Sequence, residues 1–71
     1  MEILVFKTNI QYKESIDEIA PHLYTVPGIV KWNVDLHDID KILRIVAVDL
    51  SPGLVEERIR NVGYSCEELK D

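Results

Sequence analysis

Few residues of this chain could do metal or covalent chemistry, and they are scattered along it. The sequence holds one cysteine, Cys66, and two histidines, His22 and His37. A thiolate binds soft metal ions, but a lone cysteine forms no internal disulfide and is most often a buried, unreactive side chain. The spacing predicts no nucleophile–base pair and no glycine-rich phosphate loop. We expect a protein that is not an enzyme.

A second group of potential ligands lies in one short polar segment. Asp35, His37, Asp38 and Asp40 offer carboxylate and imidazole groups that can bind a divalent ion. Their spacing matches no known metal-binding loop, and acidic turns are usually exposed to solvent. The simpler interpretation is a polar turn, and the alternative is a metal site that uses Cys66 or this turn, with His37 and Asp38 as its candidate ligands.

Composition and charge narrow the classes of partner. The 13 acidic and 8 basic side chains give a net charge of -5, which repels phosphate backbones, so nucleic acid is not an expected partner. Apolar runs such as residues 45–48 are far shorter than the roughly 20 residues of a membrane-spanning helix, and residues 1–3 do not begin a signal peptide. We expect one folded domain over residues 1–71, located in the cytoplasm.

The first half of the chain predicts a strand followed by a helix. Residues 2–8 are apolar and partly β-branched, which favours a buried strand. Ser15, with Glu18 three residues later, has the capping-box pattern and is the predicted N-cap of the helix. Pro21 removes one helical hydrogen bond, so we expect a kink or a shortened helix there. The apolar stripe of this helix consists of Ile16, Ile19, Leu23 and Val26.

The second half predicts two strands, a helix and a last strand. Residues 29–36 and 41–49 flank the polar turn, and the alternation places either Trp32 or Asn33 against the helices; an exposed tryptophan would indicate an interface. A helix begins at Ser51-Pro52 and ends at Gly63, before a strand over residues 64–69.

The order of these elements predicts the fold class. Strand-helix-strand-strand-helix-strand indicates an α+β ferredoxin-like fold, a four-stranded antiparallel sheet in the order 4-1-3-2 with both helices on one face. In this topology the first loop, residues 9–14, lies at the same end as the turn at His37 and the turn at Gly63-Tyr64.

Two short motifs resemble those of a known family. Pro27-Gly28-Ile29 lies between the first apolar stripe and Val34-Asp35-Leu36, and Gly63-Tyr64 follows the second helix. This ordered set resembles the heavy-metal-associated domains of copper chaperones and copper ATPases over nearly the whole chain. In that family the first loop carries M-x-C-x-x-C, whose two thiolates hold Cu(I). Without gaps, the methionine position falls on Ile10 and the cysteine positions on Tyr12 and Ser15.

The resemblance implies a scaffold whose defining ligands are replaced. Ile10 can fill the core as the methionine does, but a phenol and a hydroxyl are hard donors that do not replace thiolates. We therefore expect no cofactor, with a metal ion held by non-standard ligands as the alternative. The expected function is a protein-interaction or self-association module, acting on a protein partner or as a homodimer. Its contact surface is either the loop end, with Tyr12 and Tyr64, or the helix-free face of the sheet, with Trp32 as the residue that an interface would expose.

Overall fold

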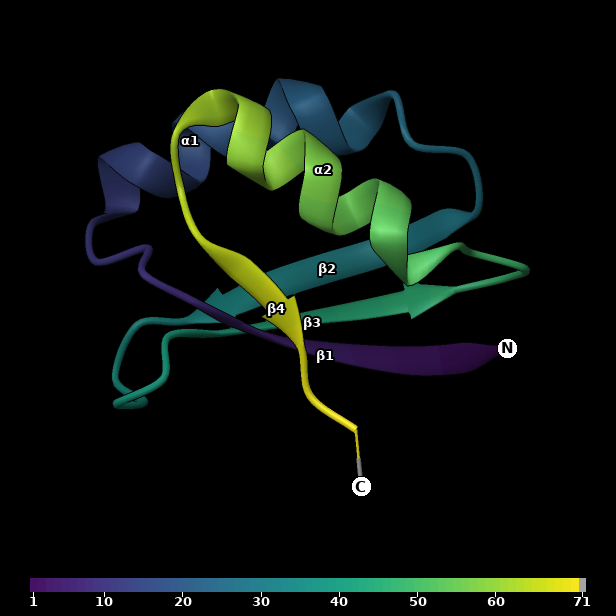
Figure 1. Ribbon diagram of the computed structural model, residues 1–71, viewed down its shortest axis with the longest axis horizontal. Coiled ribbons are helices and arrows are strands. Elements are labelled where there is room, and N and C mark those ends of the chain that lie inside the picture. The colour runs from purple at the N-terminus through teal and green to yellow at the C-terminus, as the bar shows by residue number, and fades with distance from the viewer. Residues whose placement is uncertain (71) are drawn as a thin grey trace.

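The computed structural model describes residues 1–70 and has two layers, a twisted sheet and two helices that cover one of its faces (Figure 1). The sheet has the order β2-β3-β1-β4, and all neighbouring strands are antiparallel. This is the predicted order 4-1-3-2 read from the other edge, so the ferredoxin-like prediction is confirmed. The elements are β1 (Glu2–Thr8), α1 (Lys13–Tyr24), β2 (Ile29–Asp35), β3 (Ile42–Ala47), α2 (Pro52–Val62) and β4 (Cys66–Glu68).

The core lies between the sheet and the helices. Alternate residues of the central strands β1 and β3 point into it, and both helices contribute the buried side of their apolar stripe. Burying each large apolar side chain contributes about 1.5–3 kcal/mol, so this layer fixes the helices on one face. The largest fully buried side chains include Phe6, Ile10, Ile19, Leu23, Leu43, Ile45, Val55 and Ile59.

The start of α1 differs from the prediction. The N-cap is Tyr12, and Ser15 is the third residue of the helix, with its side chain buried. The backbone N–H of Ser15 donates to the carbonyl oxygen of Tyr12 at 3.0 Å, so the first turn forms without a side-chain cap. Glu18 accepts a hydrogen bond from a distant tyrosine instead of closing a capping box. The predicted N-cap at Ser15 is therefore wrong. The Ser15 side chain is buried within the helix, and the Glu18 carboxylate bonds to a residue outside it.

Pro21 does not end α1. The helix continues three residues further, to Tyr24. A proline at this position leaves the carbonyl of Asp17 without its helical donor, and both residues are exposed, so water can replace the lost bond. The expected shortening at Pro21 does not occur.

The beginning of β2 carries an irregularity that strict alternation misses. The register shifts between Ile29 and Lys31, so Val30 is 55% exposed, although strict alternation would place it on the same face as Trp32. Gly28, just before, has φ +97°, and an added Cβ would lie 2.5 Å from the carbonyl oxygen of Val48. Only glycine therefore suits this turn.

The ends of three strands also differ from the prediction. β3 covers Ile42–Ala47, within the predicted residues 41–49. β2 ends at Asp35, and β4 is confined to three residues, Cys66–Glu68, because the chain after Gly63 first crosses from α2 back to the sheet. Within residues 1–70, no helix has the length and apolar character needed to cross a membrane.

Candidate functional site at the loop end

Three connections meet at one end of the molecule, which we call the loop end: residues 9–12, 36–41 and 63–65. The backbone N–H of Ser65 donates to Asn9 Oδ1 at 2.9 Å, which joins the last connection to the first. Thr8 links the first connection to the β2–β3 turn, because its N–H donates to the Asp40 carbonyl at 3.1 Å and its hydroxyl donates to the Lys41 carbonyl at 2.6 Å. The predicted meeting of the three connections is confirmed (Figure 1).

The first connection has a buried base and an exposed tip. Ile10 is fully buried, and its N–H donates to the hydroxyl of Thr8 at 3.2 Å. Tyr12 is 64% exposed, whereas Ser15 is buried. Ile10 thus fills the core as predicted, and the two positions that would carry thiols in the resembled family point to different environments, one to solvent and one to the protein.

Tyr64 is anchored to α1. Its hydroxyl donates to Glu18 Oε1 at 2.9 Å, and its half-buried ring packs against the core. The bond joins positions 46 residues apart in the sequence. Tyr64 therefore supports the loop end from the side and leaves Tyr12 as the exposed tyrosine of this region.

Cys66 lies inside the core, opposite Thr8 of β1. It is only 1% exposed. Burial raises the pKa of its thiol to about 12; the carboxylate of Glu56 also raises it, and Arg60 partly opposes the rise. The thiol is therefore protonated at neutral pH, and the structure offers no preformed thiolate at this position.

The acidic turn uses its carboxylates to shape the backbone. Asp35 Oδ1 accepts the N–H of His37 at 3.0 Å, and Asp38 Oδ1 accepts the N–H of Asp40 at 2.8 Å. The carboxylate of Asp40 lies 3.7 Å from the ammonium group of Lys7. Across residues 1–70, no three histidine, cysteine, aspartate or glutamate side chains gather as a metal site would require.

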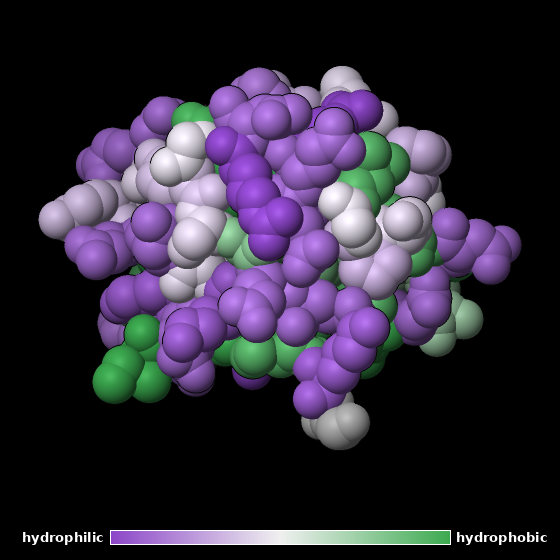
Figure 2. Space-filling view, viewed as in Figure 1, coloured by the Kyte–Doolittle hydropathy of each residue, from purple (hydrophilic) through white to green (hydrophobic). Residues whose placement is uncertain are grey.

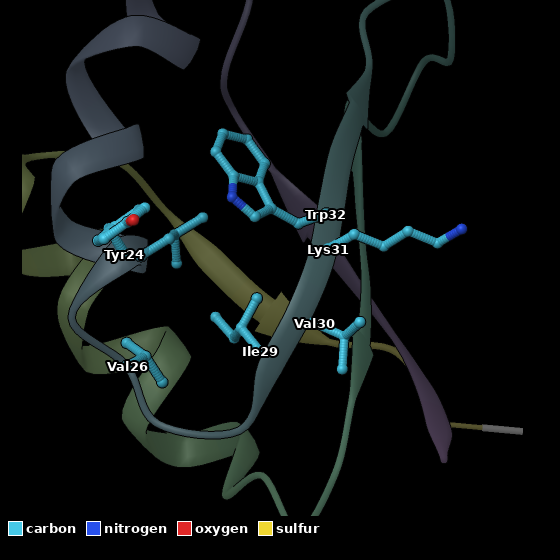
Figure 3. Close-up of a pocket in the computed structure, with 7 residues that line it drawn as sticks. Tyr24, Val26, Ile29, Val30, Lys31 and Trp32 are labelled. Carbon is cyan, nitrogen blue, oxygen red and sulfur yellow. The ribbon is translucent and has the colours of Figure 1, made fainter.

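Trp32 faces the helices, which decides the alternative that the alternation left open. Its half-buried ring packs against the core and points toward α1, while Lys31 points to the opposite side of β2 (Figure 3). Between the end of α1 and β2 lies a groove of about 480 Å³ whose lining includes Tyr24, Ile29 and Trp32. Tyr24 is 92% exposed, and because it lies off the apolar stripe, no sequence pattern indicated a role for it.

The comparisons with known proteins identify a class of fold. No protein-family model and no curated protein sequence matches the chain. Solved structures do match over its whole length, and they show that the chain has the fold of the copper-binding domains of copper transporters and chaperones. The resemblance to heavy-metal-associated domains is thereby confirmed at the level of the fold.

Three particular structures illustrate the match. The yeast copper transporter domain Ccc2a, solved in apo and Cu(I)-loaded states, has a TM-score of 0.84 at 16% identity, covering 100% of this chain and 99% of that chain. A copper-binding domain of HMA7, a P-type ATPase, has a TM-score of 0.81 at 18% identity, with coverages of 99% and 96%. The Atx1–Cu(I)–Ccc2a complex matches with a TM-score of 0.79 at 16% identity, with coverages of 100% and 99%.

These matches correct the expectation that no cofactor is involved. Ccc2a has a Cu(I)-loaded state, the HMA7 domain binds copper, and the Atx1–Cu(I)–Ccc2a complex contains Cu(I), so the comparisons point to a metal ion. The expectation inferred the absence of a metal ion from the replaced thiols at positions 12 and 15, and it kept Cys66 and the acidic turn only as alternative ligands. The groups at these two positions, the exposed phenol of Tyr12 and the buried hydroxyl of Ser15, do not fit a two-thiolate Cu(I) site.

Proposed function

We propose that this protein is a non-catalytic docking domain that binds a protein partner through its loop end. The observation that carries the proposal is the exposed ring of Tyr12 on a connection whose neighbours are fixed by hydrogen bonds. Tyrosine is enriched among the residues that dominate binding energy at protein interfaces. Support also comes from the Atx1–Cu(I)–Ccc2a complex, in which a domain of this fold takes part in a protein complex.

The rigidity of the loop end favours docking. The bonds from Ser65 to Asn9, from Ile10 to Thr8 and from the Thr8 hydroxyl to the Lys41 carbonyl link the three connections of this surface. A surface that is already ordered loses little conformational entropy on binding. The net charge of -5 favours a partner with a basic surface, because complementary charge accelerates and orients association.

A non-catalytic role agrees with the placement of the reactive groups. The Cys66 thiol is buried and protonated at neutral pH, and His22 and His37 are exposed on separate elements. A nucleophile needs a base within hydrogen-bond reach. We include in the proposal that residues 1–71 act as one domain and that the protein works in the cytoplasm, since a single buried thiol requires no oxidising compartment.

The docking proposal can be tested by placing a photo-crosslinking amino acid at Tyr12. Val48, which is also exposed and lies in the β3–α2 connection at the opposite end, serves as the control position. We expect a protein to cross-link from position 12 in cells and not from position 48. Equal cross-linking from both positions, or none from position 12, would contradict the proposal.

A substitution then measures the contribution of the tyrosine. Tyr12→Ala is expected to weaken the affinity for the cross-linked partner by about tenfold or more. Tyr24→Ala, at an exposed tyrosine at the other end of α1, is expected to leave it unchanged. Isothermal titration calorimetry measures both affinities. A Tyr12→Ala variant that binds as tightly as the wild type would place the interface elsewhere.

A second candidate function, metal-ion binding, is favoured by the Cu(I) of the matching structures. Titration with Cu(I) against a competing chelator tests it directly. Retention of one ion per chain supports this function, and loss of the ion in Cys66→Ser or in Tyr12→Ala locates the ligand. Release of all Cu(I) to the chelator contradicts it.

A further inference from the structure

The edge of the sheet at β4 is closed by side chains of α2. The guanidinium Nη2 of Arg60 donates to the carbonyl oxygen of Cys66 at 3.0 Å, and Glu56 Oε2 accepts the backbone N–H of Glu68 at 2.9 Å. Both are backbone groups that a further strand would otherwise use. Figure 2 shows this side of the molecule, where hydrophilic side chains cover α2 and β4. The β4 edge therefore offers little to a pairing strand.

The hydrogen-bond pattern shows which groups point outward at the other edge, β2. The N–H of Leu69 donates to the carbonyl of Val5 at 2.8 Å, so the backbone groups of Val5 point to the β4 side. In an antiparallel sheet these groups alternate along a strand, so those of Leu4 and Phe6 point to β3. Leu4 and Phe6 lie opposite Ile45 and Leu43 of β3. The backbone groups of these two β3 residues therefore point to β1.

The same alternation continues across β3 to the edge. Arg44, between Leu43 and Ile45, points its backbone groups to β2, where it lies opposite Asn33. Asn33 therefore bonds to β3, and the N–H and C=O groups of its neighbours, Trp32 and Val34, point away from the sheet. No side chain of residues 1–70 hydrogen-bonds to these outward groups. A groove of about 480 Å³ lies beside this edge, between β2 and the end of α1 (Figure 3).

The side chains of β2 carry complementary charges on one face. Lys31 and Asp35 lie opposite Val46 and Ile42 of β3, on the helix-free face. Neither forms an ion pair within residues 1–70, and Asp35 uses one carboxylate oxygen for the N–H of His37. The positive side chain of Lys31 and the negative side chain of Asp35 thus lie two residues before and two residues after Asn33.

We propose that two copies of this chain pair through their β2 strands, antiparallel and centred on Asn33. In this register each Lys31 lies opposite Asp35 of the second copy, so two cross-strand ion pairs form. Trp32 lies opposite Val34 at positions whose outward N–H and C=O groups can exchange hydrogen bonds. This pair also places an aromatic side chain, Trp32, opposite a β-branched one, Val34, which is a favourable combination between neighbouring strands. A second copy of β2 therefore matches both the charges and the outward backbone groups.

This pairing uses a surface other than the loop end and needs no other protein, so it is tested independently of the proposed function. Analytical ultracentrifugation of the whole chain, up to about 1 mM, is expected to show a concentration-dependent dimer. Lys31→Glu and Asp35→Lys, which each bring like charges together, are expected to raise its dissociation constant about tenfold or more.

Mixing the two variants gives the decisive result. Lys31→Glu and Asp35→Lys restore opposite charges at both ion pairs only when they pair with each other, so the mixture forms a heterodimer although each variant alone stays largely monomeric. Lys70→Glu and Glu67→Lys are the matched charge controls and are expected to dimerise like the wild type. Circular dichroism confirms that each variant is folded.

Hydrogen exchange supplies a second readout that does not depend on any variant. The amides of Trp32 and Val34 are expected to gain protection as the wild-type concentration rises, while the amide of Asn33, already bonded to β3, does not change. A wild-type chain that is monomeric throughout, a mixture that does not associate, or protection confined to another surface overturns the proposal. Pairing of β2 with an extended peptide from another protein, in place of a second copy, would also overturn it.

Discussion

The two edge strands of the sheet, β2 and β4, differ in whether side chains hydrogen-bond to their outward backbone groups. At β4, two side chains of α2 satisfy the carbonyl of Cys66 and the N–H of Glu68. At β2, within the described part of the chain, no side chain reaches the corresponding groups, and a groove lies beside them. Edge strands promote unwanted pairing unless they are blocked. Of the two edges, β2 is therefore the one whose outward backbone groups remain available for pairing.

The largest expected effect concerns the closed edge, where the Cys66 thiol is buried. Its pKa is about 12 in the folded protein, above its ordinary value of 9.0, so the folded state holds this proton more strongly than the unfolded state. The stability that results is fully present below pH 9 and is lost as the pH rises toward 12. We expect the free energy of unfolding to fall by about 2–4 kcal/mol over this range.

Urea denaturation at a series of pH values measures this loss. Cys66→Ala removes the thiol and serves as the control, because its unfolding free energy then changes only with the other groups that titrate in the same range. An equal pH dependence of the unfolding free energy in the two proteins would show that the β4 edge does not exclude water from the Cys66 thiol.

Proline substitutions compare neighbouring residues of the open edge. Asn33→Pro removes an N–H that bonds to β3 and is expected to destabilise the fold by roughly 1–3 kcal/mol. Val34→Pro removes an N–H that points outward, which edge strands tolerate, so its main expected effect is loss of self-association. Thermal unfolding and ultracentrifugation measure the two quantities. Equal destabilisation by both prolines would contradict the assignment of inward and outward groups.

Opening the closed edge should have a smaller effect. Glu56→Ala and Arg60→Ala each remove one hydrogen bond to the backbone of β4, and each is expected to cost about 1 kcal/mol. The double variant should also expose the β4 edge, so that a thiol reagent modifies Cys66 faster than in the wild type. Glu57→Ala, on the same helix and exposed, is the control. Unchanged thiol reactivity would show that these bonds do not close the edge.

Much of the fold follows from local patterns in the sequence. The order of the elements predicts the sheet, and the stripe Ile19 and Leu23 of α1 is buried as predicted. Ile10, beneath the first connection, is also buried in the core as predicted. These predictions hold because each depends on spacing within one element and on the small number of topologies that such an order allows.

The parts that could not be predicted depend on contacts between distant residues. The pair Ser15 and Glu18 has the spacing of a capping box, but Glu18 bonds to Tyr64, which the sequence does not place beside it. The face of Val30 depends on a register shift that no residue type requires. At the candidate site, the sequence indicates that Tyr12 is on a loop, but only the structure shows that the side chains of Asn9 and Thr8 bond this loop to its two neighbouring connections.

The side chains of Glu56 and Arg60 also decide how far an assembly could grow. A protein with two free strand edges can add copies without limit and form fibres, whereas a two-fold contact between identical edges is closed. When two β2 strands join, the strands left on the outside are the two copies of β4, each already occupied by its own helix. The product is a continuous sheet of finite width. The side chains of α2 prevent further strands from adding to it, so the assembly stops at two copies.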